Sequence, residues 1–225
     1  MKEFYYPVYL DLRGRDCLVV GGGEVARGKV MGLLPCGARV RVISPDADPV
    51  IQSLARNGKV RWEQRTYGEG DATGAFLVIA ATDDTQMNEA VYQEAVRERA
   101  LCNVVDVPER CQFVAASIFR RGPLVAAIST GGASPALASR LRRDLMRHWG
   151  PEYGQVTLAF GRLRPYVRAH IRDIEDRKQF WKDIVQRSEP FEMARSGASR
   201  QALDTFLQGE VARWVAAQDT QRVSG

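Results

Sequence analysis

A glycine-rich hexapeptide constrains the fold of this sequence more than any other feature. The apolar run 17–20 leads directly into Gly-Gly-Gly-Glu-Val-Ala at 21–26, which has the pattern G-x-G-x-x-A, and a helix-like stretch follows. Between a strand and a helix, the first glycine allows a tight turn and the second lets the backbone approach a pyrophosphate. The small last residue lets the helix lie close to the sheet. The motif predicts a dinucleotide-binding loop, and its structural alternative is a glycine-rich turn without a ligand.

Short apolar runs alternate with amphipathic stretches over the first hundred or so residues. The apolar runs are 17–20, 40–43, 60–62, 76–81 and 101–105, and amphipathic stretches lie between most of them. This alternation indicates right-handed βαβ crossovers and a mostly parallel sheet covered on both faces. We therefore expect an α/β fold with an N-terminal Rossmann-type parallel sheet. The helix that ends near Arg99 should begin at an N-cap on Asp84 or Thr85.

The pattern changes at about Asp106. The runs 113–117 and 124–129 are strand-like, and Arg-Arg-Gly-Pro at 120–123 is typical of a turn, so a β-hairpin is expected. Ser134 followed by Pro135 predicts the start of a helix that runs to about Trp149.

Two long amphipathic segments, 152–187 and 199–217, follow this helix. We therefore expect three domains. These are a Rossmann domain at 1–112, a small region with strands and a helix at 113–149, and a helical C-terminal domain at 150–225.

The charge of the chain is unevenly distributed. The chain has 32 Lys and Arg against 27 Asp and Glu, a net charge of +5. Between Ser117 and Arg187 there are 14 basic and 6 acidic side chains, or +8, which leaves −3 for the rest. This middle stretch is expected to face an anion.

Several classes of protein are excluded. No run of about 18 apolar residues is present that could span a bilayer, and the N-terminus lacks the long apolar stretch of a secretion signal. We therefore expect a cytoplasmic protein without a membrane partner. The four cysteines have no C-x-x-C spacing and the two histidines, His148 and His170, are not paired, so no metal site is expected.

The residues after the second strand bear on the choice of cofactor. A carboxylate that would bond the adenosine ribose is absent from Ser44, and Asp46 comes two residues late, after Pro45. Asp46 either serves the ribose or caps the next helix, and both interpretations stay open. The absence of an arginine in this loop favours NAD over NADP.

Two further acidic segments follow strand ends, where a parallel sheet opens its ligand crevice. Thr82 and Asp83 follow the strongest strand, and either line that crevice or, with Asp84, cap the next helix. Asp106 follows 103–105, and it is either a proton acceptor or a turn residue before Pro108. From spacing alone the turn is favoured.

The segment 129–135, Ser-Thr-Gly-Gly-Ala-Ser-Pro, joins a strand to a helix. Two glycines, flanking hydroxyls and a new helix N-terminus are typical of an anion-binding loop. The alternative is a solvated helix face. Nearby positive charge would come from Arg120, Arg121, Arg140, Arg142 and Arg143.

Taken together, these blocks resemble the precorrin-2 dehydrogenase family, the dehydrogenase/chelatase part of sirohaem synthase. The resemblance covers roughly residues 6–187 and rests on 7–12, 17–26, 78–84, 103–106 and 129–135, which occur in the family's order. It implies oxidation of precorrin-2 to sirohydrochlorin with NAD, and in many members insertion of ferrous iron, giving sirohaem. The sequence does not distinguish iron, cobalt or no metal as a substrate. It also implies a homodimer in which 113–149 is the dimerisation region.

The resemblance also implies roles for individual residues. Asp106 matches the family's essential aspartate, a general base. The resemblance therefore favours the proton acceptor over the turn residue that spacing alone favours. The expected cofactor-binding residues are Gly21, Gly22, Gly23, Glu24, Val25, Ser44, Pro45, Asp46, Thr82, Asp83 and Asn103. The expected substrate-binding residues are Ser129, Thr130, Gly131, Gly132, Ser134, Arg120 and Arg121. Thr130 departs from those members that have a serine there that can be phosphorylated, although hydroxyl hydrogen bonding survives the change.

Two other functions fit parts of this sequence. An NAD-binding sensor or binding module would hold the dinucleotide without chemistry and use the basic surface for a partner. An oxidoreductase for a small metabolite would need a catalytic His or Lys in the crevice, but both histidines lie in the helical half. The stretch 117–187 is expected to face a polycarboxylate ring rather than a nucleic acid.

Overall fold

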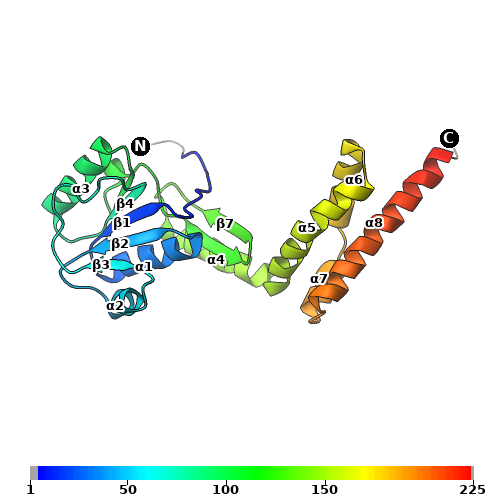
Figure 1. Cartoon of the computed structure of the whole chain (residues 1–225), viewed down its shortest axis with the longest axis horizontal. Coiled ribbons are helices and arrows are strands. Elements are labelled where there is room, and N and C mark those ends of the chain that lie inside the picture. The colour runs from blue at the N-terminus through cyan, green and yellow to red at the C-terminus, as the bar shows by residue number, and fades with distance from the viewer. Residues whose placement is uncertain (1–4, 224–225) are drawn as a thin grey trace. The chain divides into compact units, whose positions relative to one another are not determined.

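The computed structural model describes residues 5–223, and the chain divides into two compact units between Ala115 and Ala116. Each unit has its own secondary structure and its own buried side chains. We describe them one at a time, with the elements as labelled in Figure 1.

The first unit contains a five-stranded parallel sheet in the order β3-β2-β1-β4-β5. Its strands are β1 (Asp16–Val20), β2 (Arg39–Ile43), β3 (Arg61–Glu63), β4 (Leu77–Ala80) and β5 (Leu101–Val104). Its helices are α1 (Glu24–Leu33), α2 (Pro49–Arg56) and α3 (Thr85–Arg97), with short 3-10 turns η1 (Leu34–Cys36) and η2 (Pro108–Arg110). The central strands are buried on both faces, which explains their continuous apolar runs. The predicted Rossmann-type parallel sheet is confirmed.

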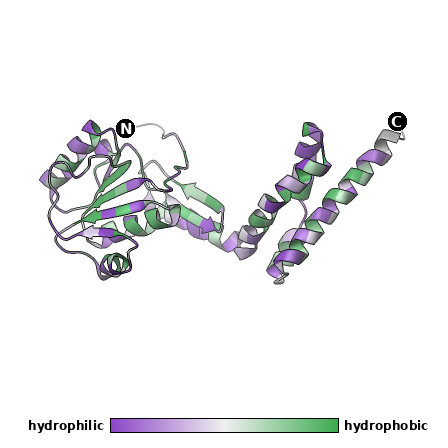
Figure 2. Ribbon diagram, viewed as in Figure 1, coloured by the Kyte–Doolittle hydropathy of each residue, from purple (hydrophilic) through white to green (hydrophobic). Residues whose placement is uncertain are grey.

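The two faces of this sheet are covered differently. Successive residues of β1 point to opposite faces, so Val19 packs with α1 and α2 whereas Leu18 packs with α3. On the α3 face, Tyr67 and Ala72 from the irregular segment 64–76 fill the place that a further helix would take. Figure 2 shows the hydrophobic strands between helices of mixed character.

The second unit consists of a hairpin and helices. Strands β6 (Ser117–Arg121) and β7 (Leu124–Ile128) pair antiparallel. The helices are α4 (Pro135–His148), α5 (Pro151–His170), α6 (Ile174–Ile184), α7 (Glu189–Arg195) and α8 (Arg200–Val223). Helices α5, α6 and α8 share a buried core that includes Leu163, Phe180 and Leu207. No helix in the described part of the chain is both long and apolar enough to cross a bilayer.

The predicted first strand of the hairpin, 113–117, is wrong. Only Ser117 of this run belongs to β6, and Arg120 and Arg121 lie in the strand rather than in the turn. The turn contains only two residues, Gly122 and Pro123, and Gly122 has φ +55°. The apolar run was misleading because its first residue, Phe113, packs into the core of the first unit.

The amphipathic segment predicted at 152–187 is divided into α5 and α6. The division falls at Asp173, whose carboxylate accepts hydrogen bonds from the amides of Glu175 and Asp176 and so starts a new helix. Helix α7 was not predicted, and α8 continues beyond the expected end at residue 217.

Candidate active site

The glycine loop between β1 and α1 lies in close contact with the neighbouring strand ends. Gly21 has φ +116°, and a Cβ there would lie 2.2 Å from the carbonyl oxygen of Ala81. A Cβ on Gly22 would lie 1.9 Å from the carbonyl oxygen of Asp46. Both positions therefore exclude any side chain, as a loop that brings its backbone close to a ligand requires.

The first turn of α1 fits a bound pyrophosphate. Gly23 is the N-cap and provides no side-chain hydrogen bond, so the first amides of α1 are not capped by a side chain. A Cβ on Gly23 would meet nothing within 4 Å, so the surroundings of this position are open. Ala26 is fully buried and lets α1 lie close to the sheet. The exposed Glu24 pairs with Arg27, and Val25 is half exposed.

The loop after β2 is held by its own hydrogen bonds. The Ser44 hydroxyl donates to the carbonyl oxygen of Asp46 at 2.6 Å, and the Trp62 indole donates to the Ser44 carbonyl at 3.0 Å. The interpretation of Asp46 as a helix cap is wrong, because Asp48 caps α2 by accepting a hydrogen bond from the Val50 amide at 2.8 Å. The Asp48 carboxylate also pairs with Arg27 of α1. Asp46 stays exposed beside the glycine loop.

The segment after β4 caps α3. Asp84 accepts hydrogen bonds from the amides of Gln86 and Met87, so the predicted N-cap is confirmed at Asp84. Thr82 exchanges hydrogen bonds with the buried Asn88 of α3, through its hydroxyl at 2.8 Å and its carbonyl at 2.9 Å. Sequence reasoning missed Asn88, although a polar residue one turn after a cap is a recognisable signal.

Asp106 follows β5, at the same end of the sheet as the glycine loop. It occupies the third position of a turn closed by a hydrogen bond from the Val107 amide to the Val104 carbonyl at 3.2 Å. Its φ is +60°, the left-handed region that favours glycine. The carboxylate is exposed and forms no ion pair or hydrogen bond with any residue that the structure describes.

Asn103 lies in β5 and is buried. Its amide group donates to Cys111 Sγ at 3.2 Å and to the Phe113 carbonyl at 2.9 Å. Gln112 also binds the segment 111–113 to β5. Its backbone amide donates to the Cys102 carbonyl, and its side-chain oxygen accepts a hydrogen bond from the Cys102 backbone amide, both at 2.9 Å. Cys111 was missed as a site residue, since its spacing in the sequence gives no signal.

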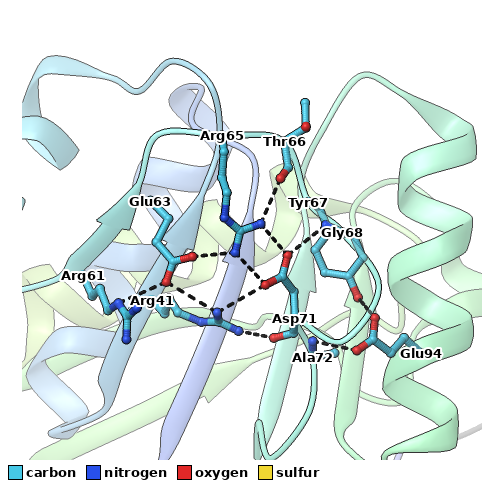
Figure 3. A network of polar contacts seen from close by, with 10 residues as sticks. All are labelled: Arg41, Arg61, Glu63, Arg65, Thr66, Tyr67, Gly68, Asp71, Ala72 and Glu94. Carbon is cyan, nitrogen blue, oxygen red and sulfur yellow. Dashed lines mark hydrogen bonds and ion pairs between the residues drawn. The ribbon is translucent and has the colours of Figure 1, made fainter.

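The segment after β3 carries a polar network that sequence reasoning also missed (Figure 3). Arg65 binds Glu63 and Asp71 together, and Arg41 reaches the same two carboxylates. The Tyr67 hydroxyl donates to Glu94 of α3, which also accepts the amide of Ala72 at 2.9 Å.

This network shifts the acidity of its members. The hydrogen bond from Arg65 holds the pKa of Asp71 below its usual range despite partial burial. Burial alone would raise the pKa of Glu63, but Arg65, Arg41 and Arg61 outweigh it and lower that pKa. Burial and Glu94 raise the pKa of Tyr67. All of these charges hold the segment 64–76 against the α3 face of the sheet.

The loop 129–135 in the second unit is ordered by its hydroxyls. The Gly131 amide donates to Ser129 Oγ at 3.1 Å, and the Ser134 amide donates to Thr130 Oγ1 at 2.9 Å. Ser134 Oγ accepts the Leu137 amide, which confirms the predicted N-cap of α4. Gly131 and Gly132 both have positive φ, of +62° and +89°.

The arginines near this loop differ in their contacts. Arg121 donates to the carbonyls of Met146 and Trp149 at 3.3 and 3.2 Å and lies over the ring of Phe119, so it fixes the end of α4. Arg120, Arg140 and Arg143 are exposed and form no ion pair with the described residues. Their charge is therefore available to an anion. Arg142 reaches the sulfur of Met146.

Three family models match successive parts of the chain. Residues 8–117 match a model described as putative NAD(P)-binding. Residues 121–148 match the central region of a sirohaem biosynthesis protein, and residues 152–204 match the sirohaem synthase dimerisation region.

Similar proteins carry consistent names. The sirohaem synthase of Nitrosococcus oceani is 39% identical over 207 residues, which cover 91% of this chain and 44% of that protein. Sirohaem synthase 1 of Serratia proteamaculans is 41% identical over 177 residues, 79% of this chain and 37% of that protein. The chain thus spans less than half the length of these relatives.

A solved structure matches nearly the whole chain. SirC, a precorrin-2 dehydrogenase, superimposes with a TM-score of 0.73 at 27% identity, covering 95% of this chain and 100% of SirC. The chain therefore belongs to the family that comprises the precorrin-2 dehydrogenases and the corresponding part of the sirohaem synthases.

Proposed function

We propose that this chain oxidises precorrin-2 to sirohydrochlorin, with NAD as the oxidant, in sirohaem biosynthesis. The observation that carries the proposal is the placement of Asp106 at the same end of the parallel sheet as the uncapped first turn of α1. The name of SirC and the sirohaem synthase relatives support it.

The cofactor would be held at the strand ends of the first unit. We assign pyrophosphate binding to the loop of Gly21, Gly22 and Gly23 and to the first residues of α1, Glu24 and Val25, whose amides and helix dipole favour an anion. NAD, when bound, supplies the hydride acceptor for the oxidation. The remaining proposed contacts are Ser44, Pro45, Asp46, Thr82, Asp83 and Asn103. No arginine in the loop 44–48 offers a partner for the extra phosphate of NADP, which favours NAD.

Asp106 would act on the substrate as a base. Its carboxylate has no partner among the described residues, so it is free to accept the proton that leaves the substrate during oxidation. We assign the carboxylate arms of the tetrapyrrole to the hydroxyl-rich loop and to the positive charge near it. The proposed residues are Ser129, Thr130, Gly131, Gly132, Ser134, Arg120 and Arg121, of which Arg121 also fixes the end of α4.

The proposal extends to the oligomeric state, the domains and the cellular location of the chain. We propose a homodimer, supported by the match of residues 152–204 to a dimerisation region. The proposed domains are 1–112 for NAD, 113–149 for the small region with strands and a helix, and 150–225 for the helical C-terminal domain. The dimerisation match lies within 150–225 and not in 113–149, where the resemblance led us to expect it. We place the reaction in the cytoplasm, where free NAD is available, and assign no nucleic acid or membrane partner.

The test uses the purified chain with precorrin-2 and NAD. We expect NADH formation together with the absorption spectrum of sirohydrochlorin. The Asp106→Asn variant should lose turnover while keeping its affinity for NAD, because asparagine tolerates a positive φ but accepts no proton at neutral pH. If the parent chain forms no NADH from precorrin-2, the proposal is wrong.

Metal insertion is the second step that we propose, with Fe(II) or Co(II) as a substrate. No group of three or more potential metal ligands occurs among the described side chains, so the ring nitrogens of sirohydrochlorin would receive the metal directly. Each ion is offered separately with sirohydrochlorin. Consumption of sirohydrochlorin identifies the metal, and its persistence with both ions marks a dehydrogenase only.

An NAD-binding sensor with a basic partner surface is the alternative that we do not favour. The matches to two sirohaem models beyond the NAD(P)-binding region support an enzyme of this pathway instead. A sensor that bound nucleic acid would show affinity that falls steeply with salt.

A further inference from the structure

The turn that carries Asp106 adopts a conformation that its sequence does not favour. Asp106 has φ +60° at a turn position normally occupied by glycine or asparagine. Arg99 is the other non-glycine residue with positive φ in the described chain. Such a conformation persists when surrounding contacts determine it, and these contacts are often found at functional sites.

Cys111 supplies those contacts from beneath the turn. Its Sγ lies 3.1 Å from the Val104 carbonyl oxygen and 3.3 Å from the Val107 carbonyl oxygen, and these are the first and last residues of the turn. The thiol has a single proton, which it can donate to either carbonyl, and its sulfur is in contact with both ends of the turn. Asn103 donates to the same sulfur at 3.2 Å and fixes its position.

The far side of the loop is anchored independently. Arg110, at the end of η2, pairs with Glu89 of α3, and Gln112 is bonded to Cys102 of β5. Cys111 lies between these two anchors and is 6% exposed. The loop ends are thus fixed without Cys111, whose own contacts lie at the two ends of the turn at Asp106.

We propose that Cys111, oriented by Asn103, is the positioning residue that holds Asp106 in its left-handed conformation and aims its carboxylate at the substrate. This inference rests on the proposed role of Asp106 as the base. It assigns to a buried thiol a positioning role rather than nucleophilic attack or metal binding. It also gives Asn103 a structural role within the loop, in addition to any contact with the cofactor.

The experiment compares the parent chain with Cys111→Ala, Cys111→Ser and the control Cys17→Ala. Cys17 is also buried, at 1% exposed, but it lies in β1, outside the Asp106 loop. Amide hydrogen exchange at Val107, measured by NMR, reports the turn without any turnover. Steady-state kinetics report kcat and the KM for NAD.

In Cys111→Ala we expect exchange at Val107 to become at least about tenfold faster, because its hydrogen-bonded turn opens more often. We expect kcat to fall by about tenfold or more, since misplacing a catalytic group by about 1 Å can cost about a hundredfold. The KM for NAD should stay within about twofold, because the glycine loop is untouched. Cys111→Ser keeps a donor and an acceptor and should lie nearer to the parent chain in both measurements.

Unchanged exchange at Val107 in Cys111→Ala would overturn the inference, whether or not the parent chain oxidises precorrin-2. So would equal losses of kcat in Cys17→Ala, which would indicate a general effect of a cavity. Faster exchange with an unchanged kcat would also overturn the inference, because the position of Asp106 would then not matter to the reaction. Absence of turnover by the parent chain counts against the proposed function alone, because the exchange measurement still tests Cys111.

Discussion

At the scale of the residue, Asp106 has a backbone conformation that opposes stability and no side-chain contact with the described residues that compensates for it. A left-handed backbone costs a residue with a Cβ roughly 1–2 kcal/mol, somewhat less for aspartate, and the exposed carboxylate gains no partner among the described residues in return. A position selected for stability alone would carry glycine. The aspartate is therefore better explained by the chemistry of its carboxylate than by the geometry of the turn.

Replacing Asp106 tests whether the residue lowers stability while it provides the carboxylate needed for turnover. We expect Asp106→Gly to raise the free energy of unfolding by about 1 kcal/mol while abolishing turnover, because glycine adopts positive φ without the steric cost. Urea unfolding measures the first effect and NADH formation the second. Asp106→Ala is the control, since it lacks the carboxylate but keeps the Cβ, and it should lose turnover without gaining stability.

Residues with a local signal were predictable at this scale. The three glycines of the first loop, the caps at Asp84 and Ser134 and the acid at Asp106 stand at recognisable positions next to strand or helix ends. Asn88 had a signal that was overlooked, its position one turn after the cap at Asp84, whereas nothing in the sequence marks the contacts that Cys111 makes with the turn. Asp46 was given the capping role that belongs to Asp48, because several acids near a helix start compete for one position.

At the scale of the element, the irregular segment 64–76 covers part of one face of the sheet, as a helix usually does in a parallel α/β fold. It closes the α3 face of the sheet with Tyr67 and Ala72, and the ion pairs among Arg65, Glu63 and Asp71 hold it in place. Because it is irregular, it has no periodic pattern, and sequence reasoning did not anticipate it. The strands were predicted because burial on both faces produces continuous apolar runs.

The network makes this segment sensitive to acid. The pKa values of Glu63 and Asp71 lie below their ordinary values of 4.5 and 3.8, so both ionised carboxylates stabilise the fold above that range. This stability is lost as the pH falls through the lowered values and the carboxylates become protonated. The segment should therefore loosen from about pH 4 downward.

We expect Asp71→Asn to lower the free energy of unfolding at neutral pH by about 2 kcal/mol, since hydrogen bonds to a charged group are lost. It should also make the decline of stability at acidic pH shallower. Urea unfolding over a series of pH values measures both. Glu69→Gln, which removes an exposed carboxylate of the same segment, serves as the control, and an equal effect of both variants would contradict the assigned role of the network.

At the scale of the whole molecule, each of the two units has its own buried hydrophobic residues in the described part of the chain. Those of the first unit lie around the parallel sheet, and those of the second include a cluster among α5, α6 and α8. The boundary between the units lies in the apolar run 113–117, which the sequence offered as a strand. Local apolar character cannot tell a strand from a connection whose side chains pack into a neighbouring core.

Damage to the buried residues of one unit should spare the other unit. Leu207 is fully buried in the second unit, and Leu207→Ala should destabilise that unit by about 2–5 kcal/mol. Calorimetry should show a lowered transition for this unit, while NAD binding by the first unit is retained. Leu158→Ala, at a position that is 51% exposed, should change neither. Loss of NAD binding in Leu207→Ala would show that the units do not fold independently.

The attachment of residues 111–113 to β5 has a consequence for solubility. A terminal strand of a sheet presents unpaired amides and carbonyls on which a strand from another molecule can add, and this is a route to aggregation. Gln112 binds both the backbone amide and the backbone carbonyl of Cys102, and the Asn103 side chain binds the Phe113 carbonyl. The outer edge of β5 is therefore already covered by residues of the same chain. At the opposite side, β3 is only three residues long and offers little length for such addition.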